Sequence, residues 1–169
     1  MVLCSALMIR ANGYGAIQDT LAYKSWYATL PLKEFKLNSP YGKRNHPVTG
    51  ERYSFHKGID IAGINEVVVS ILPGIIEKIG YTAIMGNYVI VRHGCFTVYY
   101  AHLSKIYSSV GQVLETGDPI GVTGSTGRTT GEHLHLSVVR GGLSINPLYF
   151  LLIILSMSGD ELKRYLYGR

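Results

Sequence analysis

The sequence has few cysteines and few charged side chains, and both shortages narrow the class of protein. Its two cysteines, Cys4 and Cys95, lie far apart without paired spacing, which excludes a disulfide-stapled miniprotein and a cysteine-rich zinc finger. Only 16% of the 169 residues are charged and 47% are hydrophobic, a balance that excludes an intrinsically disordered chain. A chain of this length suits one domain that buries its core without disulfide bonds.

The sequence also lacks an apolar run of the ~20 residues that a membrane-spanning helix needs. Met1 to Ile9 is apolar apart from Ser5, and small residues follow it. This pattern predicts a truncated secretory leader over residues 1–13, and therefore export to the periplasm, the cell envelope or the extracellular space. A second apolar run at 148–155 is equally short, and we expect it to pack on the domain rather than to span a membrane.

Positive charge is concentrated in the first third of the chain, within a formal net charge of +5. A basic patch attracts anionic polymers through its field, which makes nucleic acid and an anionic cell-wall glycan the two polymers to consider. The sequence contains no nucleic-acid-binding motif, and its basic residues are not interleaved with stacking aromatics. We therefore expect no nucleic-acid partner.

Between residues 50 and 147 the sequence predicts short strands joined by turns, without a helix-length amphipathic pattern. The expected strands are 67–72, 74–82, 87–93, 96–102, 111–114, 119–123 and 133–140. Such short, closely linked strands favour a mainly β fold with an antiparallel sheet or barrel. A capping box at residues 158–161 predicts a short C-terminal helix.

The histidines carry the most informative pattern. His133 and His135 alternate with leucines on one expected strand, so both imidazoles point to the same face. His56 and Asp60 are separated by Gly58, and a tight bend at the glycine would bring both to one ion. Two imidazoles and one carboxylate would leave a tetrahedral zinc with a fourth position free for water, which is typical of a catalytic site.

Three motifs in this order resemble the LytM and lysostaphin-type zinc metallopeptidases of family M23, which cut peptide bonds in bacterial peptidoglycan. They are H-x3-D at 56–60, Y-x-H-L at 100–103 and H-L-H at 133–135. Further stretches that resemble the family are 39–50, 86–93, 111–121, 124–135 and Asn146-Pro147. The resemblance covers residues 39–148 as the peptidase domain, after an N-terminal segment (14–38) and before a C-terminal tail (149–169).

The resemblance implies an antiparallel, barrel-like β sandwich with the site in an open groove. It also implies one Zn²⁺ per chain, held by His56, Asp60 and His135. His102 and His133 would be catalytic residues beside the attacking water, with His133 favoured as the base and the two roles left open. Residues expected to contact the peptidoglycan peptide are Tyr41, Arg44, Tyr100, Arg128 and Thr129.

Other functions fit these residues less well. A non-catalytic wall-binding or hydrolase-activator module with a structural zinc is the main alternative. An oxygenase with a two-histidine, one-carboxylate iron site usually has one residue between His and Asp, where this sequence has three. The glycine-rich stretch 124–131 lacks the Gly-Lys-Ser/Thr ending of a phosphate-binding loop. Glycine bridges, direct D-amino-acid cross-links and shorter stem peptides all remain candidate substrates.

Overall fold

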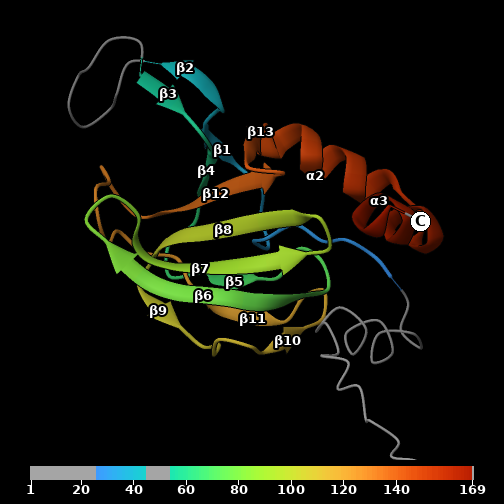
Figure 1. Ribbon diagram of the computed structural model, residues 1–169. Coiled ribbons are helices and arrows are strands. Elements are labelled where there is room, and N and C mark those ends of the chain that lie inside the picture. Colours follow the sequence, from blue (N-terminus) through green and yellow to red (C-terminus); the bar gives the residue numbers. More distant parts are fainter. Residues whose placement is uncertain (1–25, 45–53, 169) are drawn as a thin grey trace, which may run out of the picture.

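An eight-stranded antiparallel sheet is the largest element of this computed structural model, which describes residues 26–44 and 54–168 (Figure 1). Its strand order is β1-β4-β12-β8-β7-β6-β10, and β13 pairs with β12 outside this path. The strands of this sheet are β1 (Leu37–Ser39), β4 (Ile59–Ala62), β6 (Gly74–Thr82), β7 (Gly86–His93), β8 (Phe96–Leu103), β10 (Val113–Leu114), β12 (His133–Arg140) and β13 (Leu143–Ile145).

A three-stranded sheet of order β5-β11-β9 and a β2–β3 hairpin complete the β structure. Their strands are β2 (Gly42–Arg44), β3 (Ser54–His56), β5 (Val67–Val69), β9 (Lys105–Ile106) and β11 (Pro119–Val122). One hydrophobic core joins the sheets, with Val68 and Ile120 from the smaller sheet and Val89 and Leu134 from the larger one, all fully buried. The described strands therefore form open sheets packed on each other and not a closed barrel.

The mainly β, antiparallel fold is confirmed, and several strands match their expected bounds closely. The strands expected at 74–82 and 133–140 are β6 and β12 to the residue. The strand expected at 67–72 is shorter and ends at Val69. Beyond that point the main-chain amide of Ser70 donates to Asp118, and its hydroxyl donates to the carbonyl of Leu72, so the chain leaves the ladder.

Two helices end the chain, although the sequence predicted only the second. The expected capping box is present in α3 (Gly159–Tyr167), where Glu161 accepts from the main-chain amide of Ser158. The first helix, α2 (Pro147–Ser156), begins after Asn146, whose side chain accepts from Leu148. Apolar residues occupy every face of α2, so its sequence lacks the polar and apolar faces that identify a surface helix. The helix was missed for this reason.

Both helices pack near the turn between β7 and β8, and α2 begins beside β13 (Figure 1). Phe96 on β8 contacts Phe150 of α2 and Tyr165 of α3, with ring centroids 4.8 and 5.0 Å apart. Neither described helix has the length and apolar character to cross a bilayer. The predicted leader, residues 1–13, lies outside the described residues, and so does the side chain of Arg44.

Candidate metal centre and groove

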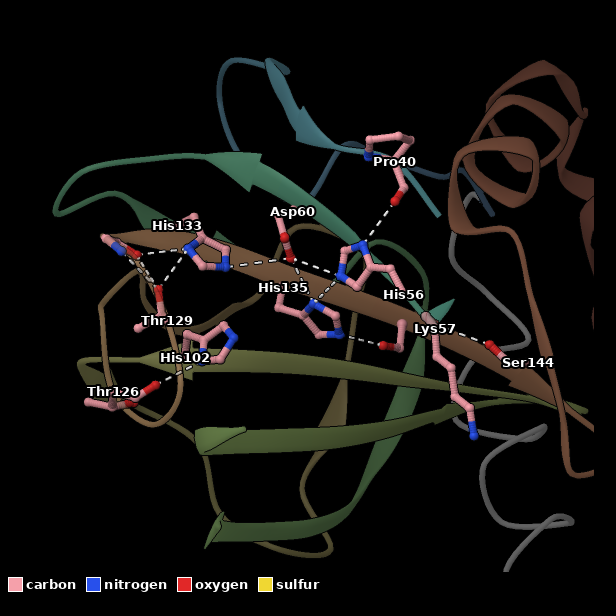
Figure 2. Close-up of polar contacts among 12 residues, drawn as sticks. Pro40, His56, Lys57, Asp60, His102, Thr126, Thr129, His133, His135 and Ser144 are labelled. Carbon is pink, nitrogen blue, oxygen red and sulfur yellow. Dashed lines mark hydrogen bonds and ion pairs between the residues drawn. The ribbon is translucent and has the colours of Figure 1, made fainter. Parts of the chain in front are cut away.

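Three side chains from three strands converge on one point, as Figure 2 shows. His56 ends β3, Asp60 lies on β4, and His135 lies directly opposite Asp60 on the neighbouring β12. Asp60 Oδ1 is 3.2 Å from His56 Nε2 and 2.8 Å from His135 Nδ1, and the two nitrogens are 3.1 Å apart. The three residues expected to bind metal are therefore brought together.

The spacing of these three atoms fits a tetrahedral ion. Zinc–nitrogen and zinc–oxygen bonds of about 2.0–2.1 Å give a tetrahedron with edges of about 3.3 Å. The three separations of 2.8 to 3.2 Å are close to that edge. A small cation with nitrogen and oxygen preference thus fits between them with only slight outward adjustment of the ligands.

Hydrogen bonds outside the triad orient both imidazoles. His56 Nδ1 donates to the carbonyl of Pro40 at 2.9 Å, which leaves its Nε2 free to face the site. His135 Nε2 is 2.8 Å from the hydroxyl of Ser137, so its Nδ1 is the atom that faces Asp60. Such outer contacts fix the tautomer and ring orientation of metal ligands. Ser137 was not identified from the sequence, and its position two residues after His135 on the same strand face is the signal that could have found it.

Gly58 lies at the bend that the sequence predicted between His56 and Asp60, and it also provides space for His135. A Cβ atom at Gly58 would lie 2.6 Å from both Cε1 and Nε2 of His135 and 2.6 Å from the carbonyl oxygen of Leu136. The φ angle of Gly58 is not in the left-handed region, so its backbone does not require glycine. The glycine is needed because the imidazole of His135 packs directly against its Cα.

His102 and His133 lie beside the triad without belonging to it, with ring centroids 4.8 Å apart. His102 has a left-handed φ of 63°, and its Nδ1 donates to the carbonyl of Thr126 at 2.8 Å. His133 Nδ1 donates to the carbonyl of Gly131 at 2.8 Å, which leaves its Nε2 facing the site, 3.5 Å from Asp60 Oδ1. Both imidazoles thus present their Nε2 side to the same space.

The electrostatics of the cluster keep Asp60 ionised and favour the neutral form of His102 and His135. Burial would raise the pKa of Asp60, but its close contacts with His133, His135 and His56 hold that pKa well below its usual range. Burial lowers the pKa of His102 to about 4, although its bond to Thr126 opposes the shift. Burial likewise lowers the pKa of His135, against the nearby Asp60 carboxylate. A carboxylate with neutral imidazoles is the state that binds a divalent cation.

The three proposed metal ligands, together with His102 and His133, line a groove of about 550 Å³. The expected contact residues Arg128 and Thr129 line it. Tyr100 does not, and that prediction was wrong: its side chain is fully buried on the opposite face of β8, where its hydroxyl accepts from Ile71. The preceding residue, Tyr99, lines the groove instead. Tyr41 is not among the lining residues, but its hydroxyl donates to the carbonyl of Ser144, which is one of them.

The chain matches a known peptidase family and resembles solved structures of similar fold. The model of peptidase family M23 matches residues 54–147. The chain is 34% identical over 133 residues to the peptidoglycan DD-endopeptidase ShyC of Vibrio cholerae, which covers 77% of this chain and 30% of that protein. The chain spans about a third of the length of the curated relatives it matches.

Two solved structures are similar in fold and in sequence. One is a zinc-containing peptidase from Vibrio cholerae, with a TM-score of 0.63 and 32% identity over 73% of this chain and 39% of that one. The other is the catalytic domain of the antimicrobial peptidase lysostaphin from Staphylococcus simulans, with a TM-score of 0.63 and 29% identity. The second match covers 70% of this chain and 92% of that domain.

Proposed function

This chain belongs to peptidase family M23, and on that premise we propose that it is a zinc endopeptidase that hydrolyses peptide bonds in bacterial peptidoglycan, in cross-links or stem peptides. The observation that carries the proposal is the convergence of His56, Asp60 and His135 beside two further imidazoles in an open groove. A relative named as a peptidoglycan DD-endopeptidase supports the substrate.

The donor set supports zinc as the ion, with one per chain. When bound, zinc supplies a Lewis acid that polarises a carbonyl group and makes water more acidic. His56 and His135 present one nitrogen each, and Asp60 presents one oxygen that offsets half of the ion's charge. Three ligands leave a tetrahedral ion one open position, whereas structural zinc sites are closed by four protein ligands. Among the described residues the cluster has three members, which favours catalysis over a purely structural zinc.

His133 is the proposed general base. Its Nδ1 hydrogen is held by the carbonyl of Gly131, so its Nε2 lone pair faces the site and can accept a proton from the attacking water. Its Nε2 is 3.5 Å from Asp60 Oδ1 and therefore next to the metal position. Once protonated, the same nitrogen can donate the proton to the leaving amine.

His102 has the complementary proposed role. Its Nδ1 hydrogen is committed to Thr126, and its ring lies 4.8 Å from that of His133 across the groove. With its hydrogen on Nδ1, His102 presents an Nε2 lone pair that can accept a hydrogen bond from the attacking water and so orient it. A two-histidine, one-carboxylate iron site has no need of such a pair, which is why the oxygenase alternative is not favoured.

The proposed substrate supports a location in the periplasm, the cell envelope or the extracellular space. Relatives named as peptidoglycan endopeptidases support this location. The peptidoglycan peptide is the proposed partner, through direct contacts in the groove.

Digestion of purified peptidoglycans by the zinc-loaded protein tests the proposal, with mass spectrometry of the released fragments and of the bound metal. We expect the native protein to release peptide fragments. His135→Ala should lose both zinc and activity. His133→Ala should keep zinc and lose about 10²–10⁴-fold in rate, the usual contribution of a general base. Absence of release from every wall type, or full activity in His133→Ala, would refute the proposal.

A further inference from the structure

Two cationic side chains line the groove on either side of the metal position. Lys57 follows His56 directly, and its carbonyl accepts a hydrogen bond from Ser144 at 3.1 Å. Arg128 precedes Thr129 in the loop before His133, and its main-chain amide donates to Ile84 at 3.1 Å. Figure 2 shows Lys57 at the end of the site formed by His56 and Ser144, and Thr129 at the end formed by His133. Lys57 and Thr129, the residue after Arg128, thus lie at opposite ends of the site (Figure 2).

Neither charge is neutralised by the residues around it. Both side chains are exposed, and neither makes an ion pair with any residue in the described ranges 26–44 and 54–168. Asp60 is the one acidic residue among the described groove residues, and it belongs to the metal site. Because Asp60 offsets only half of a divalent ion, the groove with its metal is strongly positive.

Two exposed apolar side chains line the same groove, one close to each cation along the main chain. Phe55, two residues before Lys57, is 50% exposed, and Ile84, which accepts from the Arg128 amide, is 58% exposed. Apolar walls weaken solvent screening of a charge and so strengthen its attraction for an opposite charge on a bound ligand. The groove therefore combines apolar contact with a positive charge at each end.

We propose that Lys57 and Arg128 determine specificity by binding carboxylates of the substrate on the two sides of the scissile bond. The proposal rests on the function proposed above and narrows its substrate to peptides that carry free carboxylates, such as acidic stem peptides and their direct cross-links. A neutral glycine bridge offers no partner for either cation. Arg128 can bind a carboxylate through two parallel hydrogen bonds, whereas Lys57 acts as a point charge.

The test uses two versions of one cross-linked peptidoglycan fragment, with its carboxylates either free or amidated. The measured quantity is the ratio of kcat/KM for the free fragment to kcat/KM for the amidated fragment. We expect the native ratio to be well above one and to fall as ionic strength rises. Lys57→Gln and Arg128→Gln should each lower the ratio about tenfold, which corresponds to about 1.4 kcal/mol.

Lys78→Gln is the matched control, because Lys78 is an exposed cation on β6 outside the groove and its loss changes the net charge equally. It should leave the ratio unchanged, and all variants should keep their zinc. Equal kcat/KM for both fragments in the native protein would overturn the inference. So would losses in the groove variants that are the same for both fragments, since these would reflect a structural defect.

Calorimetric binding of both fragments to zinc-loaded His133→Ala separates this inference from the proposed function. If the native protein cuts neither fragment, the proposed function is refuted. Tighter binding of the free fragment than of the amidated one, with the difference lost in Lys57→Gln and Arg128→Gln, would still support carboxylate recognition. Equal binding of both fragments would overturn it whether or not cleavage occurs.

Discussion

His135 and Asp60 face each other directly across β12 and β4, with His135 Nδ1 2.8 Å from Asp60 Oδ1. On its other side, His135 is paired with Ala101 of β8, so His102 follows one residue beyond. The main-chain register of β12 thus places two proposed metal ligands and a neighbouring imidazole. His56 is different, since it ends β3, which pairs only with β2 among the described strands. Its position depends on the Pro40 carbonyl and on Gly58.

Gly58→Ala should damage the metal site. The new methyl group would overlap the His135 ring and the Leu136 carbonyl, each 2.6 Å from the Cβ position, and the ring would have to move. We expect zinc affinity to fall by about tenfold or more, as for other changes that disturb ligand orientation. Competition with a chromogenic chelator measures it. Gly131→Ala is the control, because no atom lies within 4 Å of its Cβ position. Unchanged zinc affinity in Gly58→Ala would show that His135 does not need the space that Gly58 leaves.

Ser137→Ala should weaken zinc binding without unfolding the sheet. The hydroxyl of Ser137 is 2.8 Å from His135 Nε2 and fixes the ring that turns Nδ1 to the metal. Loss of such an outer partner costs about 10–100-fold in metal affinity. Ser70→Ala removes a fully buried hydroxyl, which donates to the carbonyl of Leu72 away from the site, and should leave zinc affinity unchanged. Equal effects of the two variants on zinc binding would show that Ser137 has no specific role.

Local patterns in the sequence predicted much of this architecture. Alternation of histidine and leucine placed His133 and His135 on one face of a strand, and β12 has the expected bounds. The capping box at Ser158 correctly predicted α3, because its hydrogen bonds join residues three apart. In these cases the structure depends on residues that are close together in the sequence, so a local sequence pattern predicts it.

Contacts between distant residues were not predictable in the same way. The sequence correctly predicted a bend at Gly58, but it did not predict that the glycine also accommodates the ring of His135, on a strand far along the chain. Tyr99 and Tyr100 occupy adjacent positions, and only the pairing of β8 with its neighbours decides which of them faces the groove. The family resemblance supplied the grouping of His56, Asp60 and His135, which strand spacing alone left open.

Thr129→Val should lower kcat and leave zinc content unchanged. The hydroxyl of Thr129 accepts from the Gly131 amide and lies 3.3 Å from His133 Nδ1, so it helps to hold the proposed base. Loss of one such hydrogen bond costs about 1 kcal/mol, or roughly fivefold in rate if it acts on the transition state. Steady-state kinetics on a peptidoglycan fragment measure it, and Thr129→Ser should restore kcat. A rise in KM alone would assign Thr129 to substrate contact.

His93 should make the protein less stable in acid. It is fully buried at the end of β7, its Nδ1 donates to the carbonyl of Pro73, and its Nε2 has no hydrogen-bond partner. Burial lowers the pKa of His93 from 6.5 to about 4, against the opposing effect of the Pro73 bond. As the pH falls below 6.5, the unfolded chain therefore takes up a proton that the folded protein excludes, and unfolding becomes more favourable until about pH 4.

The size of this effect follows from the shift, since each pKa unit corresponds to about 1.4 kcal/mol. Between about pH 7 and about pH 4.5, His93 should thus reduce the free energy of unfolding by about 2–3 kcal/mol. Denaturant unfolding of the metal-free protein measures this loss. His93→Gln keeps an amide donor for Pro73 but cannot titrate. Over the same pH range its free energy of unfolding should therefore fall by about 2–3 kcal/mol less than that of the native protein. His102 and His135 contribute equally to both proteins, so the difference isolates His93. Parallel loss of stability in the two proteins would mean that His93 gains no proton on unfolding.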